Sequence, residues 1–381
     1  MRFARLTNEH NIYGMKLIIS GGGTGGHIYP AIAIAQAVQR LAPETEVLFV
    51  GALGKMEMEK VPQAGYAIEG LWISGFQRKL GWELFSFPFK LLSSWWKSRQ
   101  ILNRFRPDVV VGVGGYASGV LVKTATWAGI PALIHEQNSH AGLTNRKLAQ
   151  SVQKVCVAYP NMERFFPAAK IVHTGNPIRQ DIVDISQKSA QVADYEYFGL
   201  DPQLPTLLVL GGSLGARTIN QTFQQALELL SKEPIQVLWQ CGKLYHEQLK
   251  DLVSPYKNVH LRPFLDKMPS AYAVADIIVS RAGALSISEI CVAGKPAIFI
   301  PSPNVTDDHQ TANARALADK GAAILVKDAE AIQTLVPIVL DLFDQPEKRK
   351  TLSENIRTFA VANAAEQIAK EVLGLIRKAV V

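Results

Sequence analysis

The chain has few cysteines and no long hydrophobic run. Only three of its 381 residues are cysteine, and Cys156, Cys241 and Cys291 form no CxxC pair. This spacing argues against a disulfide framework or a zinc cluster, so we expect three buried, reduced thiols. No apolar run reaches the roughly 18 to 20 residues that cross a bilayer, and the polar, charged segment 1–13 is unlike a signal peptide. We therefore expect a globular cytoplasmic protein.

Two glycine-rich turns of one design lie about 190 residues apart. The first, Gly21–His27, joins the apolar run 17–20 to a helical pattern over 31–39, and the second, Gly211–Gly215, follows the run 207–210. Glycines let the backbone approach a ligand closely, and amides at a helix start point at an anion or a sugar oxygen. The duplication predicts two nucleotide-fold halves, each large enough for its own core.

A dinucleotide site is the first alternative for the first turn. Residues 21–26 satisfy G-x-G-x-x-G, but that fingerprint also needs an acid at the end of the second strand, about 20 residues on, to hold the ribose. The expected strand 46–50 has its acids, Glu44 and Glu46, at its start. An NAD- or FAD-dependent enzyme is therefore disfavoured.

Short β-rich runs alternate with helical segments along the whole chain, which is typical of parallel sheets covered on both faces. After the first run, we expect strands at 47–50, 109–113, 132–135, 154–157, 206–210, 236–240, 259–261, 277–280 and 297–300. The polar stretch 181–197 is expected to be the crossing between domains, and 350–381 to be helical throughout. The prediction is an α/β chain with domains at 15–178 and 179–360 and a dispensable tail at 1–14.

The segment from Trp72 to Arg106 holds seven basic residues against one acid and four of the six tryptophans, so it carries most of the net charge of +7. Aromatic rings beside cations suit the interface of an anionic membrane or a nucleic acid. Alternatively, Pro88 opens a core helix whose Phe89, Leu92 and Trp96 face the adjacent sheet. The part upstream of Pro88 is the better candidate for exposure. We expect membrane contact at Phe76, Arg78, Lys79, Trp82 and Phe85.

Polar, glycine-rich residues follow several of the expected strands, where parallel sheets collect their ligands. Seven such motifs occur in order over residues 15 to about 315: GGTGGH, GGYAS, HEQN followed by AGLTNR, TGNPIR, GGSLGAR, RAGALSISE and DHQTANA. The set closely resembles the MurG family of N-acetylglucosaminyltransferases. The resemblance implies a GT-B fold, in which two Rossmann-like parallel-sheet domains face a cleft and a C-terminal helix, about 361–381, packs on the first domain.

The same resemblance implies an inverting transfer of N-acetylglucosamine from UDP-N-acetylglucosamine to the 4-hydroxyl of the muramyl sugar of lipid I, which makes lipid II for peptidoglycan. Negative charge builds on the departing UDP, and metal-dependent glycosyltransferases hold it with a D-x-D pair and a cation. This chain has no D-x-D. Amides at helix starts beside Ser213 and Gly283, with Arg179, can stabilise that charge instead. No metal or other cofactor is expected.

Several donor contacts are implied by the resemblance. Glu289 matches the residue that binds the ribose hydroxyls, although a helix-dipole partner is the structural alternative. His309, Gln310 and Asn313 match sugar-recognising positions, and Gln310 is the firmer match. Leu214 stands where a glutamine is common, which leaves only backbone contacts there. The other expected donor contacts are Thr24, Gly25, Gly26, Asn138, Ala284 and Leu285, of which Thr24 and Asn138 also reach the acceptor pocket.

The acceptor side needs a base for the attacking hydroxyl, and histidine titrates in the right range. His27, at the lip of the first glycine turn, is the first choice, with orientation of the acceptor diphosphate as the alternative. For His135, a packing or hydrogen-bonding role is the alternative to an acceptor contact, because Glu136 can hold its ring in place. The expected acceptor contacts are Gly23, Tyr116, His135, Glu136 and Asn145.

The expected partners follow from this assignment. They are the donor nucleotide, lipid I, the anionic cytoplasmic face of the inner membrane and other cell-wall synthesis proteins, but no nucleic acid. A transferase of the same fold with a diacylglycerol-type acceptor is the closest alternative, and the HEQN and TGNPIR motifs argue against it.

Overall fold

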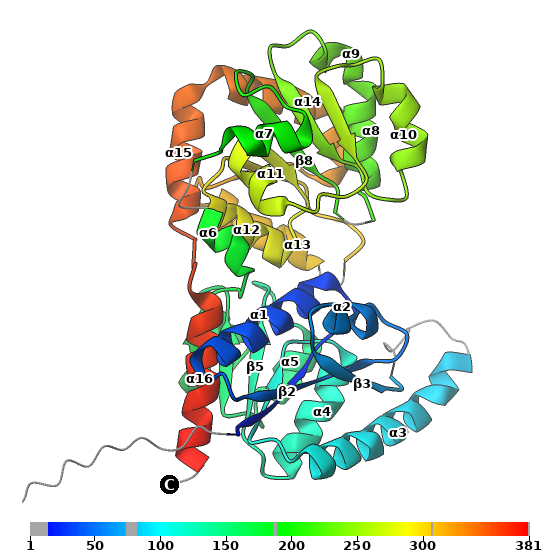
Figure 1. Ribbon diagram of the computed structural model, residues 1–381, viewed down its shortest axis with the longest axis vertical. Coiled ribbons are helices and arrows are strands. Elements are labelled where there is room, and N and C mark those ends of the chain that lie inside the picture. Colours follow the sequence, from blue (N-terminus) through cyan, green and yellow to red (C-terminus); the bar gives the residue numbers. More distant parts are fainter. Residues whose placement is uncertain (1–13, 74–81, 186–188, 213, 306–307, 380–381) are drawn as a thin grey trace, which may run out of the picture. The chain divides into compact units, whose positions relative to one another are not determined.

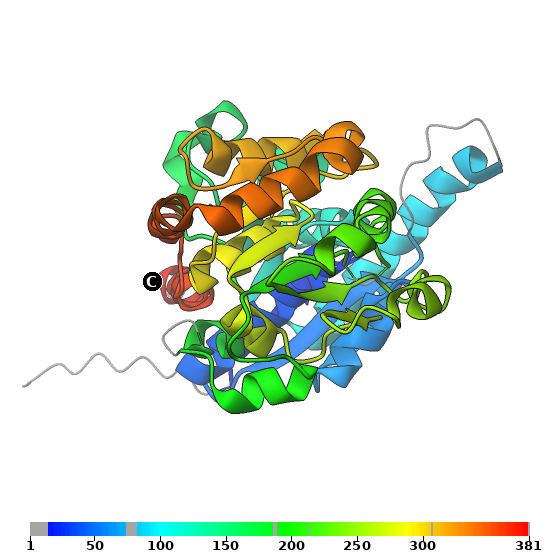
Figure 2. The same ribbon diagram turned by 90° about the horizontal axis from the view of Figure 1, so that it is seen from above.

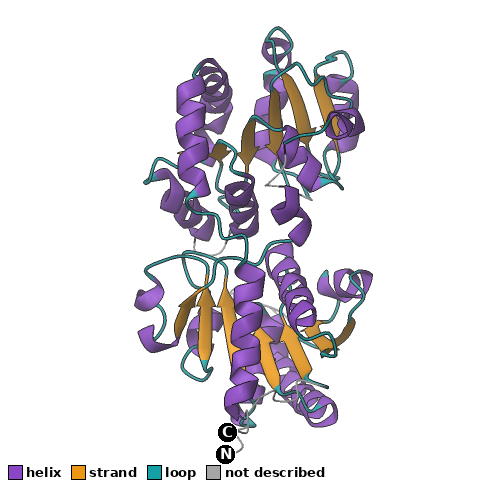
Figure 3. Cartoon of the chain, turned by 60° about the vertical axis from the view of Figure 1, so that its left-hand side comes forward, coloured by secondary structure: helices purple, strands orange, loops and turns teal. Residues whose placement is uncertain are grey.

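The computed structural model describes the chain except residues 1–13, 74–81, 186–188, 213, 306–307 and 380–381, and it describes only the backbone at 82–85, 185 and 377–379. The chain divides into two compact units. The first comprises residues 1–137, 141–177 and 363–381, and the second comprises 138–140 and 178–362. Each unit is a parallel sheet with helices on both sides (Figure 3). This is the α/β class with two Rossmann-like units that the alternating pattern predicts.

The first unit has a seven-stranded parallel sheet in the order β3-β2-β1-β4-β5-β6-β7. Its strands are β1 (Lys16–Ser20), β2 (Glu46–Ala52), β3 (Ala67–Leu71), β4 (Val109–Gly112), β5 (Ala132–Glu136), β6 (Lys154–Val157) and β7 (Ile171–His173). Its helices are α1 (Gly25–Leu41), α2 (Glu57–Gln63), α3 (Trp82–Phe105), α4 (Tyr116–Trp127), α5 (Leu143–Leu148) and α16 (Ala364–Ala379). The central strands are fully buried apolar runs, as strands covered on both faces must be.

The second unit has a six-stranded parallel sheet in the order β10-β9-β8-β11-β12-β13. Its strands are β8 (Thr206–Leu210), β9 (Gln236–Gln240), β10 (Val259–Arg262), β11 (Ile277–Ser280), β12 (Ala297–Phe299) and β13 (Ile324–Leu325). Its helices are α6 (Gln180–Ile185), α7 (Val192–Phe198), α8 (Arg217–Gln225), α9 (Leu227–Leu230), α10 (His246–Val253), α11 (Met268–Val274), α12 (Ala284–Ala293), α13 (His309–Ala318), α14 (Ala331–Asp344) and α15 (Pro346–Arg357).

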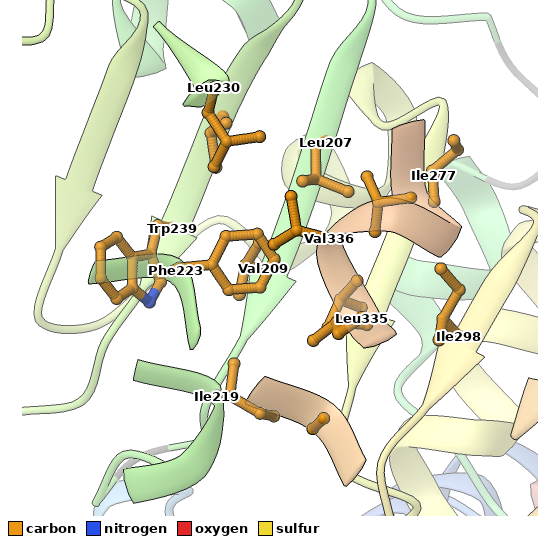
Figure 4. Packing of buried hydrophobic residues seen from close by; sticks show 14 of the residues in the cluster. Leu207, Val209, Ile219, Phe223, Leu230, Trp239, Ile277, Ile298, Leu335 and Val336 are labelled. Atoms are coloured by element: carbon orange, nitrogen blue, oxygen red, sulfur yellow. The ribbon is translucent and has the colours of Figure 1, made fainter. Parts of the chain in front are cut away.

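The core of the second unit forms where α8 and α14 pack on its sheet (Figures 2 and 4). Phe223 and Trp239 lie with their ring centroids 6.0 Å apart. The indole nitrogen of Trp239 donates to Asn220 Oδ1 at 3.1 Å, so the buried ring also satisfies its polar atom. Leu335 and Val336 of α14 complete this cluster over β8.

Three expectations are wrong. The chain passes from the first unit to the second between residues 177 and 178, so the segment 181–197, expected to be that crossing, belongs to the second unit. Its described residues contribute to α6 and α7, and α7 begins at a capping box between Gln191 and Asp194. Residues 350–381 are not one helix, because the chain leaves α15 at Arg357 and starts α16 at Ala364, each in a different unit. α16 packs along α1 within the first unit (Figure 1). Pro88 lies inside α3, which already begins at Trp82.

No helix in the described part of the chain is long and apolar enough to cross a membrane.

All three cysteines are free and buried, which confirms the expected buried thiols. Burial raises the pKa of Cys156 to about 12, of Cys241 to about 11 and of Cys291 to about 12. Because the thiolate is the reactive form, we expect no reaction of the native chain with an aromatic disulfide reagent at pH 8. Three thiols should react in denaturant. Rapid release of the reporter thiol from the native protein would contradict this burial.

Candidate active site

The first glycine turn orients His27 through the backbone. Gly23 has a positive φ of 87°, and the extended Thr24 leads directly into α1. His27 lies in the first turn of that helix, half-buried, and its Nδ1 donates to the carbonyl oxygen of Gly22 at 2.9 Å. In the neutral imidazole the other nitrogen, Nε2, then carries the lone pair. A base at this position would accept a proton through Nε2.

A second glycine loop lies against the first. A Cβ at Gly114 would come within 2.8 Å of His27 Nε2, and one at Gly115 within 2.7 Å of the Gly22 oxygen. Both glycines also have positive φ angles, which disfavour other residues. The GGYAS motif therefore forms the wall beside the imidazole, and its glycines are required by this close approach.

Glu57, at the start of α2, is a part of this site that the sequence analysis missed. Its side chain is fully buried, and its carboxylate accepts the amides of Gly23 and Ala52, both at 2.9 Å. A Cβ at Gly22 would lie 2.0 Å from Glu57 Oε1, and one at Gly51 2.5 Å from its Cγ. The Gly23 amide, expected to contact a ligand, is thus occupied by a protein carboxylate.

His135 and Gln137 form a buried hydrogen-bonded group at the end of β5. The His135 ring is fully buried, with Nε2 donating to Gly175 O at 3.0 Å and Nδ1 accepting from Gln137 Nε2 at 3.0 Å. Burial, together with the nearby His27, lowers the pKa of His135 to about 4, against a smaller opposite effect of the Gly175 bond. Gln137, not the expected Glu136, holds the ring.

Glu136 instead fixes the loop after its strand. Its Oε2 accepts Asn145 Nδ2 at 2.9 Å and the amide of Gly142 at 3.1 Å. Asn145 Nδ2 also donates to His135 O at 3.1 Å. Glu136 and Asn145 are both buried, and these hydrogen bonds tie the loop after β5 to α5.

Tyr116, at the start of α4, is 51% exposed and borders an apolar groove of about 540 Å³. The groove lies between α3, α4 and α5. Its lining includes Leu91, Leu92, Trp95, Val120, Trp127 and Leu148, with Lys123 and Lys147 among them. The groove therefore joins the glycine loop after β4 to a hydrophobic surface.

α3 presents several large apolar side chains outward, whereas Ile101 and Leu102 near its end are buried. Phe89, Leu92 and Trp96 are 73%, 71% and 62% exposed, so the alternative in which they face the sheet is wrong. Lys97 and Arg104 pair with Glu69 of β3, which neutralises part of the expected positive charge. All five predicted membrane contacts lie outside the described side chains: Phe76, Arg78, Lys79, Trp82 and Phe85.

In the second unit, the two expected helix starts differ. Ser213 is outside the described residues, and α8 begins at Arg217, directly after the glycine turn. α12 begins at Ala284, directly after Gly283, as the motif predicts. The first turn of a helix directs its amides at an anion, and α12 brings Ala284 and Leu285 to that position.

Glu289 lies on α12 beside Tyr272 and Arg179. The Tyr272 hydroxyl donates to Glu289 Oε2 at 2.9 Å. Burial raises the pKa of Glu289 to about 6, against smaller lowering effects of Arg179 and the Tyr272 hydrogen bond. Tyr272, which is buried, was not predicted, since nothing in its local sequence distinguishes it from a core residue. The second unit thus brings Arg179, Glu289 and the start of α12 together.

The DHQTANA motif forms the start of α13, where Gln310 Oε1 accepts the amide of Ser302 at 2.8 Å. Asn313, expected to contact the sugar, is fully buried. Its Oδ1 accepts the Ser139 amide at 2.9 Å, and its Nδ2 donates to Asn138 Oδ1 at 3.1 Å. Asn313 and Asn138 therefore hold the segment 138–140, which belongs to the second unit, and Gln310 is the better placed of the expected sugar contacts.

Within the described residues, no group of three or more His, Cys, Asp or Glu side chains is arranged to hold a metal ion.

Comparison with known proteins identifies the family to which these sites belong. Residues 17–157 match the glycosyltransferase family 28 N-terminal domain, and residues 206–368 match the C-terminal domain of that family. A protein of Cytophaga hutchinsonii called UDP-N-acetylglucosamine--N-acetylmuramyl-(pentapeptide) pyrophosphoryl-undecaprenol N-acetylglucosamine transferase is 54% identical over 361 residues, covering 95% of this chain and 97% of that protein. The Bacteroides fragilis protein of the same name is 51% identical, covering 97% and 99%.

Solved structures agree with the sequence comparison. The crystal structure of Acinetobacter baumannii MurG superposes with a TM-score of 0.76 at 31% identity and covers 94% of this chain and 99% of that one. The UDP-GlcNAc 2-epimerase of Neisseria meningitidis, at 16% identity and a TM-score of 0.68, covers 94% and 100% and shares the fold alone.

Proposed function

Because the chain belongs to glycosyltransferase family 28, in the MurG family, we propose that it transfers N-acetylglucosamine from UDP-N-acetylglucosamine to an undecaprenyl-diphosphate-linked muramyl-pentapeptide, forming lipid II. The observation that carries the proposal is the near-full-length identity of 54% to a transferase with that donor and acceptor in its name. His27 in the first unit, and Glu289 and α12 in the second, supply groups with the required chemistry.

In the proposed reaction, the 4-hydroxyl of the muramyl sugar attacks the anomeric carbon of the donor. Its oxygen forms the new C–O bond while the bond from that carbon to the UDP oxygen breaks, with inversion of configuration. His27 Nε2 takes the hydroxyl proton, since its Nδ1 is already bonded to the Gly22 carbonyl. The transition state resembles an oxocarbenium ion, so negative charge moves to the departing UDP.

The second unit carries the groups proposed for the donor. The first turn of α12 after Gly283 and the guanidinium of Arg179 stabilise the charge that develops on the diphosphate. Glu289 accepts the ribose hydroxyls. Gln310 presents its side-chain amide group to the sugar, because its oxygen is bonded to the Ser302 amide.

A polyprenyl acceptor is anchored in a membrane, so the enzyme must act at a lipid surface. Features of the first unit support this part of the proposal. The groove bordered by Tyr116 has a mainly apolar lining that suits an alkyl chain, and the exposed apolar side chains of α3 continue it. Cations lie among the rings, with Lys90 Nζ 5.9 Å from the Trp72 ring and Lys123 Nζ 5.4 Å from the Trp127 ring. We propose that this surface lies on the anionic cytoplasmic leaflet.

The membrane proposal makes a direct prediction. Replacing both Phe89 and Trp96 by serine should reduce binding to vesicles of anionic phospholipid at least tenfold, because burial of either ring contributes roughly 1.5–3 kcal/mol. Sedimentation with vesicles measures this. The matched control is Leu244→Ser, which removes a similarly exposed side chain (67%) from the second unit and should leave binding unchanged. Equal vesicle binding by the double variant and the wild type would contradict the assignment.

The transfer reaction itself is tested with labelled UDP-N-acetylglucosamine and a lipid I analogue in detergent, in the presence of a chelator. Labelled disaccharide lipid is the expected product, and UDP-glucose should give far less. A diacylglycerol acceptor in a parallel reaction tests the alternative lipid class. If the donor binds without product from lipid I, the acceptor is wrong, and if the donor does not bind, the proposed activity is wrong.

A further inference from the structure

We infer that Glu57 is a positioning residue for His27 and acts through the single peptide group between Gly22 and Gly23. This inference rests on the proposed function, in which His27 takes a proton. It concerns a buried carboxylate on α2 that lies outside every motif of the resemblance.

The peptide group is held at both ends. Its amide, the N–H of Gly23, donates to Glu57 Oε2 at 2.9 Å. Its carbonyl, the oxygen of Gly22, accepts His27 Nδ1 at 2.9 Å. The carboxylate, the peptide and the imidazole therefore form one hydrogen-bonded chain. A negative charge at the amide end polarises the peptide and makes its carbonyl a stronger acceptor, since linked hydrogen bonds reinforce one another.

The consequence for His27 is a fixed tautomer. A strong acceptor at Nδ1 keeps the proton there and leaves the lone pair on Nε2, the atom that faces the backbone of Gly114. A carboxylate that orients a histidine and selects its tautomer is familiar from the serine protease triad. Here one peptide group lies between the two side chains.

The surroundings of Glu57 require a carboxylate. It is fully buried, and its second oxygen, Oε1, accepts the amide of Ala52 at the end of β2 at 2.9 Å. Two amide donors converge on a group that only accepts, whereas a glutamine would turn its NH₂ toward one of them. Positions 22 and 51 are glycine, and a Cβ at either would collide with the Glu57 side chain, so the backbone encloses this side chain closely.

The test compares wild type with Glu57→Gln, which keeps the size of the side chain and removes its charge. We expect kcat to fall about 10- to 100-fold, by analogy with the loss seen when the hydrogen-bond partner of a metal-binding histidine is removed, with the KM for UDP-N-acetylglucosamine within about twofold. In ¹⁵N-histidine-labelled protein, above the titration range of histidine, wild-type His27 should show only the Nδ1–H tautomer. The variant should show a mixture.

The control is Asp108→Asn. Asp108 also accepts a backbone amide next to β1, that of Lys16 at 2.7 Å, but at the opposite end of the strand from the glycine turn. It should leave both the tautomer and kcat unchanged. Retention of wild-type kcat or of a single tautomer in Glu57→Gln would overturn the inference.

The wild-type spectrum is decisive even if the variant fails to fold, because an Nε2–H tautomer of His27 contradicts the hydrogen-bonded chain by itself. If the wild type makes no product, the proposed function fails, whereas the two spectra still decide whether Glu57 sets the tautomer.

Discussion

Replacing His27 by alanine should lower kcat for transfer to lipid I by about 10²- to 10⁴-fold, the usual contribution of a general base. The KM for UDP-N-acetylglucosamine should change far less, because most of the expected donor contacts, among them Arg179, Glu289 and Gln310, belong to the second unit. The reason is the orientation of the ring, whose Nδ1 is bonded to Gly22 O and whose Nε2 is left to take the proton. Steady-state kinetics with each substrate varied in turn measure both constants.

Two further variants separate a base from a group that orients the acceptor diphosphate. His27→Gln keeps a hydrogen-bond donor near the position of Nε2 but takes no proton, so it should be as slow as the alanine variant. Recovery of most of the rate by glutamine would favour the orienting role. His173→Ala, which removes an exposed histidine of the same unit, should leave both constants unchanged. Equal loss of kcat and donor affinity in His27→Ala would contradict the base assignment.

The elements that could be predicted from the sequence are those with strong local patterns. β1, β4, β8 and β11 are short apolar runs buried on both faces, and each was predicted within a residue or two. β3, β7 and β13 were missed. All three are edge strands with at least two half-buried residues, and β13 has only two residues, so their sequences carry little hydrophobic signal.

The residues of the candidate sites likewise divide into those with a strong local sequence pattern and those without one. The glycine turn places His27 by its own spacing, and Gly283 marks the start of α12. Glu57 and Tyr272 were missed because their partners lie far from them in sequence, as Gly23 and Glu289 show. A motif also does not reveal whether a polar residue faces a ligand or the protein.

Asn313 and His135 illustrate that second difficulty. Both stand in motifs rich in polar residues, yet both are buried, with their polar atoms bonded to the protein. Sequence spacing predicts that such residues gather at the strand ends. Only the packed structure distinguishes those that line the ligand site from those that hold its loops.

Glu289→Gln should weaken binding of UDP-N-acetylglucosamine about 10- to 100-fold at pH 7.5, because hydrogen bonds to a charged group contribute roughly 1.5–3 kcal/mol. The carboxylate accepts both ribose hydroxyls in the proposed complex, and a glutamine offers one acceptor fewer. Isothermal titration calorimetry of the donor alone measures the change without the acceptor. Wild-type affinity in the variant would remove Glu289 from the donor site.

Because the pKa of Glu289 is raised, donor binding should depend on pH and become weaker as the pH falls. Burial raises this pKa to about 6 in the free protein, so the carboxylate is ionised above that pH and protonated below it. Ribose hydroxyls bind the ionised form, and the dissociation constant should therefore be constant above about pH 7. It should rise as the pH falls below 6, by at most about tenfold for each pH unit, and level off near the 10- to 100-fold loss expected of the neutral glutamine. In Glu289→Gln this dependence should disappear.

Tyr272→Phe tests whether the ionisation of Glu289 causes this pH dependence of donor binding. The hydroxyl donates to Glu289 Oε2 at 2.9 Å and lowers the pKa of that carboxyl, opposing burial. Its removal should therefore raise the pKa of Glu289 further and move the midpoint of donor binding to higher pH, with affinity at pH 8 nearly preserved. A midpoint that moves to lower pH, or a wild-type profile that stays flat between pH 5 and 8, would show that the ionisation of Glu289 does not control donor binding.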